Sequence, residues 1–203
     1  MIAILDYKMG NVQSIVNMFK KIGVLAKVTA DPIAIKDAEK LILPGVGYFD
    51  YAMQNLRATP YFSLLNELVL EQKRPILGIC LGAQLMLDGS EEGEPTPGLS
   101  WIKGKVVKFK IADHGLRVPH MGWNDVVIHK ESNLVRMLPE EPRFYFVHSY
   151  YLDVAQEADI LLTTDYGLPF TSAFSRDNIY GVQFHPEKSH KFGMQLLKNF
   201  AQL

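Results

Sequence analysis

The chain of 203 residues has little cysteine and almost no net charge. Its single cysteine, Cys80, excludes an internal disulfide and a cysteine-rich metal site, so this thiol is either packed in the interior or reactive. Basic residues number 21 and acidic residues 22, and neither sign forms a long run, which argues against a nucleic-acid-binding arm or a polybasic membrane patch. No apolar run approaches the ~20 residues that span a bilayer, and the amino terminus lacks a basic signal-peptide region. We therefore expect a cytoplasmic protein that binds neither nucleic acid nor membrane.

The composition is that of a globular chain, with 48% hydrophobic and 21% charged residues. Domains usually contain about 100–200 residues, and the sequence has no internal repeat, low-complexity tract or linker. We therefore predict a single domain that covers residues 1–203.

The first half of the chain alternates short apolar runs with helical patterns, which is typical of parallel strands joined by crossover helices. Strands are predicted at Ile2–Asp6, Ala26–Thr29, Leu41–Leu43 and Pro75–Cys80. Helices are predicted at residues 12–19, at Phe49–Leu56, at Phe62–Glu71 and, after Cys80, through Leu85, Met86 and Leu87.

The second half has a different pattern, in which most apolar runs alternate with polar residues as in antiparallel strands. A loop at Gly89–Gly98 carries three acids, and a final helix is predicted at Ser189–Leu203. The strands predicted between them are Val106–Ile111, Trp123–Ile128, Phe144–Val147, Ile160–Thr164, Thr171–Phe174 and Ile179–Phe184. The expected fold is α/β and flavodoxin-like: an open, mostly parallel central sheet, flanked by helices, with an antiparallel extension.

Cys80 lies in the pattern G-x-C-x-G, between a predicted strand and a helix. This arrangement matches a nucleophile elbow, in which small neighbours such as Gly78 and Gly82 permit a strained backbone at the nucleophile. The amino end of the following helix would favour a thiolate and leave the Leu81 N–H free to bind an oxyanion. The alternative is a buried structural cysteine between two packing glycines.

A base for this thiol is available in His185, which is followed two residues later by Glu187. In an extended chain this spacing places both side chains on one face, so that the carboxylate can orient the imidazole. A surface turn residue is the alternative for a histidine next to Pro186. Both motifs, however, follow predicted strands of one sheet, and open α/β sheets have their sites at the carboxyl ends of the strands.

The segment Pro44-Gly45-Val46-Gly47 also follows a predicted strand. Its glycines would permit a peptide flip that directs the Val46 N–H at the same oxyanion. An ordinary turn is the alternative.

Together these motifs resemble the class I glutamine amidotransferases, whose glutaminase domains carry a G-x-C-x-G elbow and an H-P-E segment. Further blocks, in order along nearly the whole chain, resemble the glutaminase subunits of imidazole glycerol phosphate synthases. These blocks are Asp6-Tyr7 with Gly10-Asn11, Pro44–Gly47, Gly78–Gln84, Val118–Asn124 and Gln183–Ser189.

The resemblance implies that Cys80 attacks the carboxamide of L-glutamine, that His185 transfers protons and that Glu187 orients His185. It places backbone N–H groups of Val46 and Leu81 at the oxyanion. The glutamine-binding residues that it implies are Gly47, Gln84, Ser149 and Tyr150. It implies no metal and no cofactor.

The resemblance also implies a partner, a cyclase subunit of the (β/α)₈-barrel type that forms a heterodimer with the glutaminase and receives its ammonia. The residues that match the family's interface are Asn11, Met121, Trp123, Tyr145 and Lys188. A tryptophan in a strand can also be a core residue, although large aromatic residues are favoured as interface anchors.

Three alternatives stay open. Ser189–Met194 and Phe170-Thr171-Ser172 resemble a subset of the family that supplies ammonia to nucleotide-sugar amidotransferases. A free-standing γ-glutamyl hydrolase could use the same triad without a partner. A catalytically silent binding module could keep the fold for partner contact alone.

Overall fold

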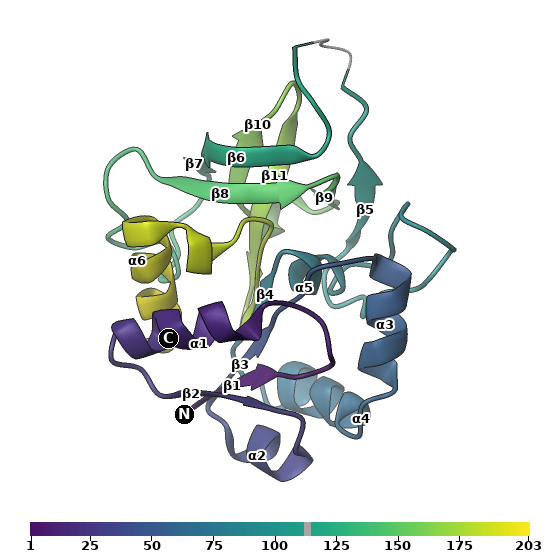
Figure 1. The fold of residues 1–203 in the computed structure, drawn as a ribbon, viewed down its shortest axis with the longest axis vertical. Coiled ribbons are helices and arrows are strands. Elements are labelled where there is room, and N and C mark those ends of the chain that lie inside the picture. Colours follow the sequence, from purple (N-terminus) through teal and green to yellow (C-terminus); the bar gives the residue numbers. More distant parts are fainter. Residues whose placement is uncertain (112–114) are drawn as a thin grey trace.

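A mostly parallel sheet runs through the centre of the molecule in the computed structural model, which describes residues 1–111 and 115–203 (Figure 1). The strand order along the sheet is β2-β1-β3-β4-β12-β11-β10-β7, and β5 joins through β9, which pairs with β11. The pairs from β2 to β12 are parallel, and those from β12 to β7 are antiparallel. This confirms the predicted open, mostly parallel sheet with an antiparallel extension. The strands are β1 Ile2–Leu5, β2 Ala26–Thr29, β3 Lys40–Leu43, β4 Ile76–Ile79, β5 Gly104–Lys108, β7 Val127–Ile128, β9 Tyr150–Val154, β10 Ile160–Asp165, β11 Pro169–Arg176 and β12 Ile179–Val182.

Helices cover both faces of this sheet (Figure 1). They are α1 Val12–Lys21, α2 Pro32–Asp37, α3 Phe49–Arg57, α4 Phe62–Asn66, α5 Leu81–Gln84 and α6 His190–Ala201. Helix α4 continues into a π-helical turn at Glu67–Glu71, and 3₁₀ turns lie at Glu157–Asp159 and Pro186–Lys188.

Each face of the sheet has its own hydrophobic core. Phe19 of α1 and Leu196 of α6 are buried on one face, and Phe49 of α3 and Leu65 of α4 on the other. Because the central strands are covered on both sides, they consist of continuous apolar residues, as parallel strands usually do.

A separate two-stranded ribbon lies beside the main sheet. It pairs β6 His120–Asp125 with β8 Arg143–His148 in an antiparallel register that places Trp123 opposite Tyr145. The predicted single strand Trp123–Ile128 is therefore wrong, because β7 leaves the ribbon and pairs with β10. The chain changes sheets at Val126, whose side chain is buried and whose N–H bonds to the Pro142 carbonyl.

The predicted helix through Leu85, Met86 and Leu87 is also wrong, since α5 ends at Gln84. The carbonyls of residues 85–87 accept hydrogen bonds from the N–H groups of residues 99–102 instead of continuing a helix. The loop after Gly98 thus competes successfully for these acceptors.

Two elements were not predicted, α2 and β9. Helix α2 had a signal in the sequence, because Asp31 caps it by accepting a hydrogen bond from the Ile33 N–H at 3.0 Å and Pro32 occupies its first position. Strand β9 follows β8 almost immediately, and its pairing with β5 is a long-range contact that no local pattern indicates.

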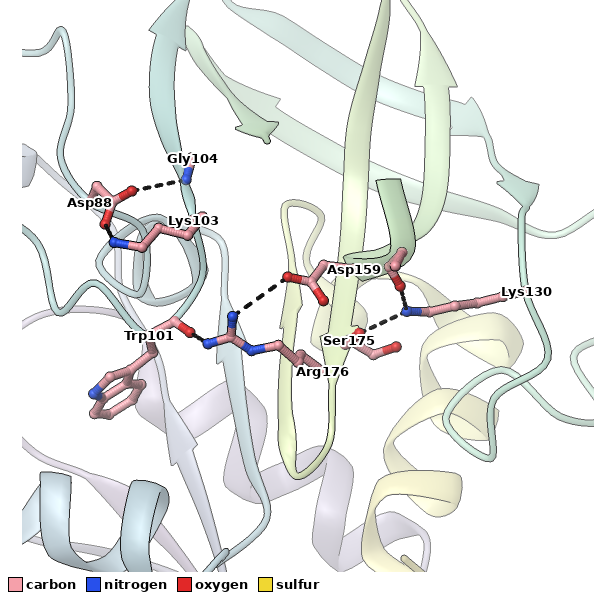
Figure 2. Close-up of polar contacts among 9 residues, drawn as sticks. Asp88, Trp101, Lys103, Gly104, Lys130, Asp159, Ser175 and Arg176 are labelled. Atoms are coloured by element: carbon pink, nitrogen blue, oxygen red, sulfur yellow. Dashed lines mark hydrogen bonds and ion pairs between the residues drawn. The ribbon is translucent and has the colours of Figure 1, made fainter. Parts of the chain in front are cut away.

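Figure 2 shows a polar network around Arg176 and Lys130. Arg176 pairs with buried Asp159 at 3.8 Å and donates to the Trp101 carbonyl, while Lys130 donates to the Ser175 carbonyl at 2.7 Å. Arg176 is opposite Ile179, which is itself opposite Ile76 at the start of β4, so this network lies at the amino end of β4. It joins the loop before β5 to the antiparallel part of the sheet.

Candidate active site

Cys80 occupies the sharp turn between β4 and α5. Its backbone angles, φ 54° and ψ −113°, are ones that residues other than glycine rarely adopt. Such strain at a nucleophile is what the elbow arrangement predicts. Helix α5 has only four residues, so the helix dipole that we expected to favour the thiolate is that of a single turn.

The glycines on either side of Cys80 are required by close backbone contacts. A Cβ atom on Gly82 would lie 1.8 Å from the Leu43 carbonyl oxygen, and one on Gly78 would lie 2.7 Å from the Ala83 Cα. Neither neighbour is a flexible side chain that could move away. The sequence reasoning that small residues are needed here therefore has a direct cause, the close approach of α5 to β3 and β4.

His185 and Glu187 form a buried pair next to this turn. The His185 Nδ1 lies 2.7 Å from the Glu187 Oε1, and the two side chains are 2% and 4% exposed. The His185 backbone is held on both sides, because its N–H donates to the Tyr145 carbonyl and its carbonyl accepts from the Ser189 hydroxyl. Among the described residues, the His185 Nε2 has no hydrogen-bond partner. This nitrogen is therefore available to a thiol or a substrate.

The electrostatic environment keeps His185 protonated at neutral pH. Burial lowers the pKa of the imidazole, but interactions with the Cys80 sulfur and with Glu187 outweigh burial and raise the pKa to about 10. A protonated imidazole beside a sulfur nucleophile carries the proton that a leaving amine requires.

Cys80 and His185 open into one cavity of about 430 Å³, within the usual size range of small-molecule sites. The residues predicted to bind the oxyanion and glutamine line the same cavity, although their roles stay predictions. They are Val46, Gly47, Leu81, Gln84, Ser149 and Tyr150.

The Pro44–Gly47 segment contributes Val46 and Gly47 to the cavity wall and is held in place by Tyr7. The buried Tyr7 hydroxyl donates to the Pro44 carbonyl, and burial strongly raises the pKa of this phenol. A Cβ on Gly45 would lie 2.6 Å from the same hydroxyl. Val46 is 43% exposed, so this residue is at the rim of the cavity.

Gln84 is part of a buried hydrogen-bond network that reaches the Cys80 sulfur. Its Nε2 donates to the Tyr150 carbonyl at 3.2 Å and to the Gln183 Oε1 at 3.1 Å. The Gln183 Nε2 lies 3.8 Å from the Cys80 sulfur. Gln84 is 5% exposed, so it is a buried residue and not a polar residue on the helix surface.

Sequence reasoning missed Glu92, which also lines the cavity. Its Oε2 accepts a hydrogen bond from the Phe49 N–H at 3.0 Å, which ties the Gly89–Gly98 loop to the start of α3. Burial raises the pKa of this carboxyl group. The three acids of the loop were the only available signal, and they did not distinguish Glu92 from its neighbours. Pro119, Val147 and His148 line the cavity as well and were also not singled out as cavity residues.

Four of the five predicted interface residues form a continuous surface, which we call the β6 patch: Met121, Trp123, Tyr145 and Lys188. Met121 is 61% exposed and Trp123 44%. The centres of the Trp123 and Tyr145 rings are 6.4 Å apart, and the Lys188 ammonium lies 5.7 Å from the centre of the Tyr145 ring. Trp123 is therefore a surface residue rather than a core residue. Asn11, the fifth residue, is exposed at the start of α1.

The fold and the site together define a class: an α/β enzyme with a thiol nucleophile at a strand–helix turn and a histidine–carboxylate pair beside it. The model of the family "Glutamine amidotransferase class-I" matches residues 3–203. The chain belongs to the class I glutamine amidotransferase family.

Relatives agree with this assignment, and a solved structure has the same fold. The chain is 55% identical over 202 residues to "Imidazole glycerol phosphate synthase subunit HisH 2" of Methanococcus maripaludis, covering 100% of this chain and 99% of the relative. It is 50% identical to the protein of the same name from Pseudomonas aeruginosa, over 100% of both chains. The crystal structure of a glutamine amidotransferase superposes with a TM-score of 0.73 at 17% identity, over 100% of this chain and 99% of that one.

No helix in residues 1–111 and 115–203 is long and apolar enough to cross a membrane. No group of three or more histidine, cysteine, aspartate or glutamate side chains among them could hold a metal ion.

Proposed function

We propose that this chain is the glutaminase subunit of an imidazole glycerol phosphate synthase, which hydrolyses L-glutamine and passes the ammonia to a cyclase partner in histidine biosynthesis. The observation that carries glutamine hydrolysis is the convergence of the strained Cys80 with a His185 held by Glu187 at one cavity. The histidine pathway is supported by full-length identities of 55% and 50% to proteins named as HisH subunits.

In the proposed reaction, the Cys80 sulfur attacks the side-chain amide carbon of glutamine. The negative charge that develops on the amide oxygen is stabilised by the backbone N–H groups of Val46 and Leu81. Collapse of this intermediate breaks the C–N bond, and His185 donates its proton to the departing nitrogen, which leaves as ammonia. A water molecule then gives a proton to His185 and attacks the thioester as hydroxide, which releases glutamate and the Cys80 sulfur and leaves His185 protonated as at the start.

Glutamine also carries an α-ammonium and an α-carboxylate, which the cavity must recognise. We assign the α-ammonium to Glu92, whose carboxylate lines the cavity. Ser149 and Tyr150 are assigned to the rest of the substrate, in keeping with their position in the cavity wall.

The cyclase partner is proposed to be a (β/α)₈ barrel that docks over the cavity mouth and contacts the β6 patch and Asn11. Exposed aromatic and methionine side chains are favoured at protein interfaces, and the patch offers the exposed Met121 and Trp123 beside a half-buried Tyr145. Met121 is paired with Val147, which lines the cavity. A cytoplasmic heterodimer is part of this proposal.

The proposal is tested by reconstituting the chain with its cyclase partner and comparing two nitrogen sources. Cys80→Ala is expected to abolish glutamine-dependent synthesis while ammonia-dependent synthesis continues at the wild-type rate, because removing a nucleophile costs about 10⁴-fold or more. Glutamine-dependent synthesis by Cys80→Ala would contradict the mechanism.

The same assay separates the alternative functions. Ammonia transfer to a nucleotide-sugar acceptor but not to the histidine precursor would replace the proposed pathway. Full glutamine turnover without any partner would indicate a free-standing hydrolase. Failure of a glutamine-like electrophile to label Cys80 in the assembled complex would indicate a silent binding module.

A further inference from the structure

Two buried histidines that have no part in the mechanism above form a pair next to the glutamine cavity. His120 of β6 is directly opposite His148 of β8, and the His120 Nδ1 lies 3.0 Å from the His148 Nε2. The side chains are nearly inaccessible, with 2% and 6% of the residue surface exposed. His148 itself lines the cavity.

Aromatic rings surround this pair. His120 is stacked between Phe146 and Tyr166, with ring centres 4.7 and 4.0 Å away. Phe109 and Phe170 lie 5.3 and 5.4 Å from the His148 ring. Such apolar surroundings disfavour a charged imidazole. Burial lowers the pKa of His120 to about 4 and that of His148 to about 3, and the neighbouring His120 and His185 also lower the pKa of His148.

The hydrogen bonds define the tautomer of each ring. The His148 Nδ1 lies 2.7 Å from the Tyr150 carbonyl oxygen, which can only accept, so this nitrogen carries the hydrogen. The His148 Nε2 must then accept, and its donor is the His120 Nδ1. The remaining nitrogen, the His120 Nε2, accepts from the Asn124 amide at 3.3 Å. Both rings are neutral, and all four nitrogens are engaged, so none is available to exchange a proton with the substrate.

The pair is one section of a longer chain of hydrogen bonds. The Tyr150 carbonyl that accepts from His148 also accepts from Gln84, which continues through Gln183 to the Cys80 sulfur. At the other end, Asn124 is bonded to the Asp165 carbonyl and lies on β6, the strand that carries the exposed Trp123. An uninterrupted path therefore joins the ribbon to the nucleophile.

We propose that His120 and His148 are positioning residues for glutamine hydrolysis. They hold the Tyr150 main chain, and through it the Gln84 amide, in the geometry that binds glutamine. This inference rests on the proposed function, because it assigns the pair a task in the binding of that substrate.

The test compares His148→Phe and His148→Asn in the complex with the cyclase. Phenylalanine keeps a flat ring in the aromatic surroundings but donates nothing to Tyr150, so the KM for glutamine is expected to rise about tenfold, the value of one lost hydrogen bond. Asparagine has an amide nitrogen near the position of the Nδ1, so its KM should stay within about threefold of wild type. The rate at which iodoacetamide alkylates Cys80 should differ by less than about twofold among the three proteins, since the thiol itself is not displaced.

His129→Asn is the matched control, because His129 is an exposed histidine whose side chain bonds to the Thr163 hydroxyl. It should leave the KM unchanged. A wild-type KM for His148→Phe, or an equal increase for His148→Asn, would overturn the positioning role. If the wild-type complex itself does not hydrolyse glutamine, the proposed function is wrong. That result is distinct from a failure of the positioning role, which shows only in the comparison of the variants.

A second measurement uses the wild-type protein and therefore does not depend on whether a variant folds. In ¹⁵N-histidine NMR of the wild-type protein, His120 and His148 should both show a protonated Nδ1 and an unprotonated Nε2, and should stay neutral from pH 8 to pH 6. A protonated Nε2 on His148, or titration of either ring in this range, would contradict the hydrogen-bond chain and with it the proposal.

Discussion

Glu187 restrains His185 through a single short hydrogen bond, and the pair is almost completely buried. This buried carboxylate and the Cys80 sulfur together keep the imidazole protonated. In the proposed reaction, the histidine therefore starts as an acid and acts as a base only after it has given its proton to the departing nitrogen. The order of the two proton transfers in this proposal follows from the electrostatics of one residue and its two neighbours.

Glu92 is the residue whose substitution best tests how the cavity recognises the α-ammonium of glutamine. Glu92→Gln keeps the size of the side chain and removes its charge. We expect the KM for glutamine to rise about 10–100-fold, because a hydrogen bond to a charged group contributes about 1.5–3 kcal/mol, while kcat changes much less.

Steady-state kinetics of the complex measures this effect, with Glu94→Gln as the control, since Glu94 belongs to the same acidic loop but is not among the cavity residues. An unchanged KM for Glu92→Gln would remove Glu92 from the substrate site.

The buried histidine pair also makes a prediction about stability against pH. The folded-state pKa values of about 4 and about 3 lie below the ordinary histidine value of 6.5. Between pH 6.5 and pH 4 the unfolded chain therefore binds more protons, so the free energy of unfolding falls as the pH is lowered. The slope is about 1.4 kcal/mol per pH unit for each histidine.

Denaturant unfolding at pH 7, 6 and 5 should show this loss in the wild type and a shallower one in the double variant His120→Phe/His148→Phe. The charged and titratable groups near the pair are Tyr166 and His185, and both remain in the double variant. Identical slopes for the two proteins would show that the pair is not neutral in the folded state.

These residues also show the reach of sequence reasoning. That Cys80, His185 and Glu187 lie close together could be predicted, because the strands before them are parallel and the carboxyl ends of parallel strands meet at one edge. Glu92 meets the start of α3 from 43 positions away, and His120 meets His148 across 28 positions. Neither contact follows a local period, because both depend on how a loop and a ribbon pack over the sheet.

At the scale of elements, the turn between β4 and α5 depends on the absence of side chains at Gly78 and Gly82. Gly82→Ala would place a Cβ against the Leu43 carbonyl, and neither backbone can yield without moving α5 away from β3. We expect a loss of about 2–3 kcal/mol in the free energy of unfolding, together with at least a tenfold loss in glutamine hydrolysis as Cys80 moves.

Gly23→Ala is a suitable comparison. A Cβ at Gly23 meets nothing within 4 Å, and its φ of 74° makes the substitution strained but leaves it remote from the site. It should cost about 1–2 kcal/mol without affecting hydrolysis. Equal activity loss in the two variants would mean that general destabilisation, rather than displacement of the turn, is responsible.

The errors in the predicted elements have a common physical cause. The helix expected through Leu85, Met86 and Leu87 loses its carbonyls to the loop after Gly98, and the strand expected at Trp123–Ile128 divides between two sheets at Val126. In both cases the local pattern was compatible with the prediction, and a distant segment supplied better hydrogen-bond partners. Tertiary contacts override local propensity most easily in such short elements.

At the scale of the whole molecule, the cavity lies at the carboxyl end of β4 and is also lined by β8, which pairs with β6 and its patch, whereas the Arg176 network lies at the amino end of β4. The cavity and the proposed docking surface are thus separated from the polar contacts that join the two halves of the sheet. The order of elements predicted from the sequence was sufficient to place the cavity at the carboxyl ends of the parallel strands, because that position follows from the parallel topology.

Docking of the cyclase partner should depend on the β6 patch. Trp123→Ala is expected to weaken the complex at least tenfold, because buried tryptophans often contribute about 2 kcal/mol or more at interfaces, and to leave the thermal unfolding temperature unchanged. Titration of the cyclase into each variant by calorimetry measures the affinity.

Leu25→Ala is the control, since Leu25 is 72% exposed and lies beside the start of β1, at the amino edge of the sheet. Comparable weakening by the two substitutions, or none by Trp123→Ala, would exclude the β6 patch as the docking surface.

The solitary cysteine has a further consequence for the living cell. If peroxide oxidises Cys80 to a sulfenic acid, the chain contains no second thiol that could capture it as an internal disulfide. Protection from irreversible oxidation must then come from small reductants that enter the cavity. The capacity to use glutamine nitrogen is consequently tied to the redox state of the surroundings through a single atom.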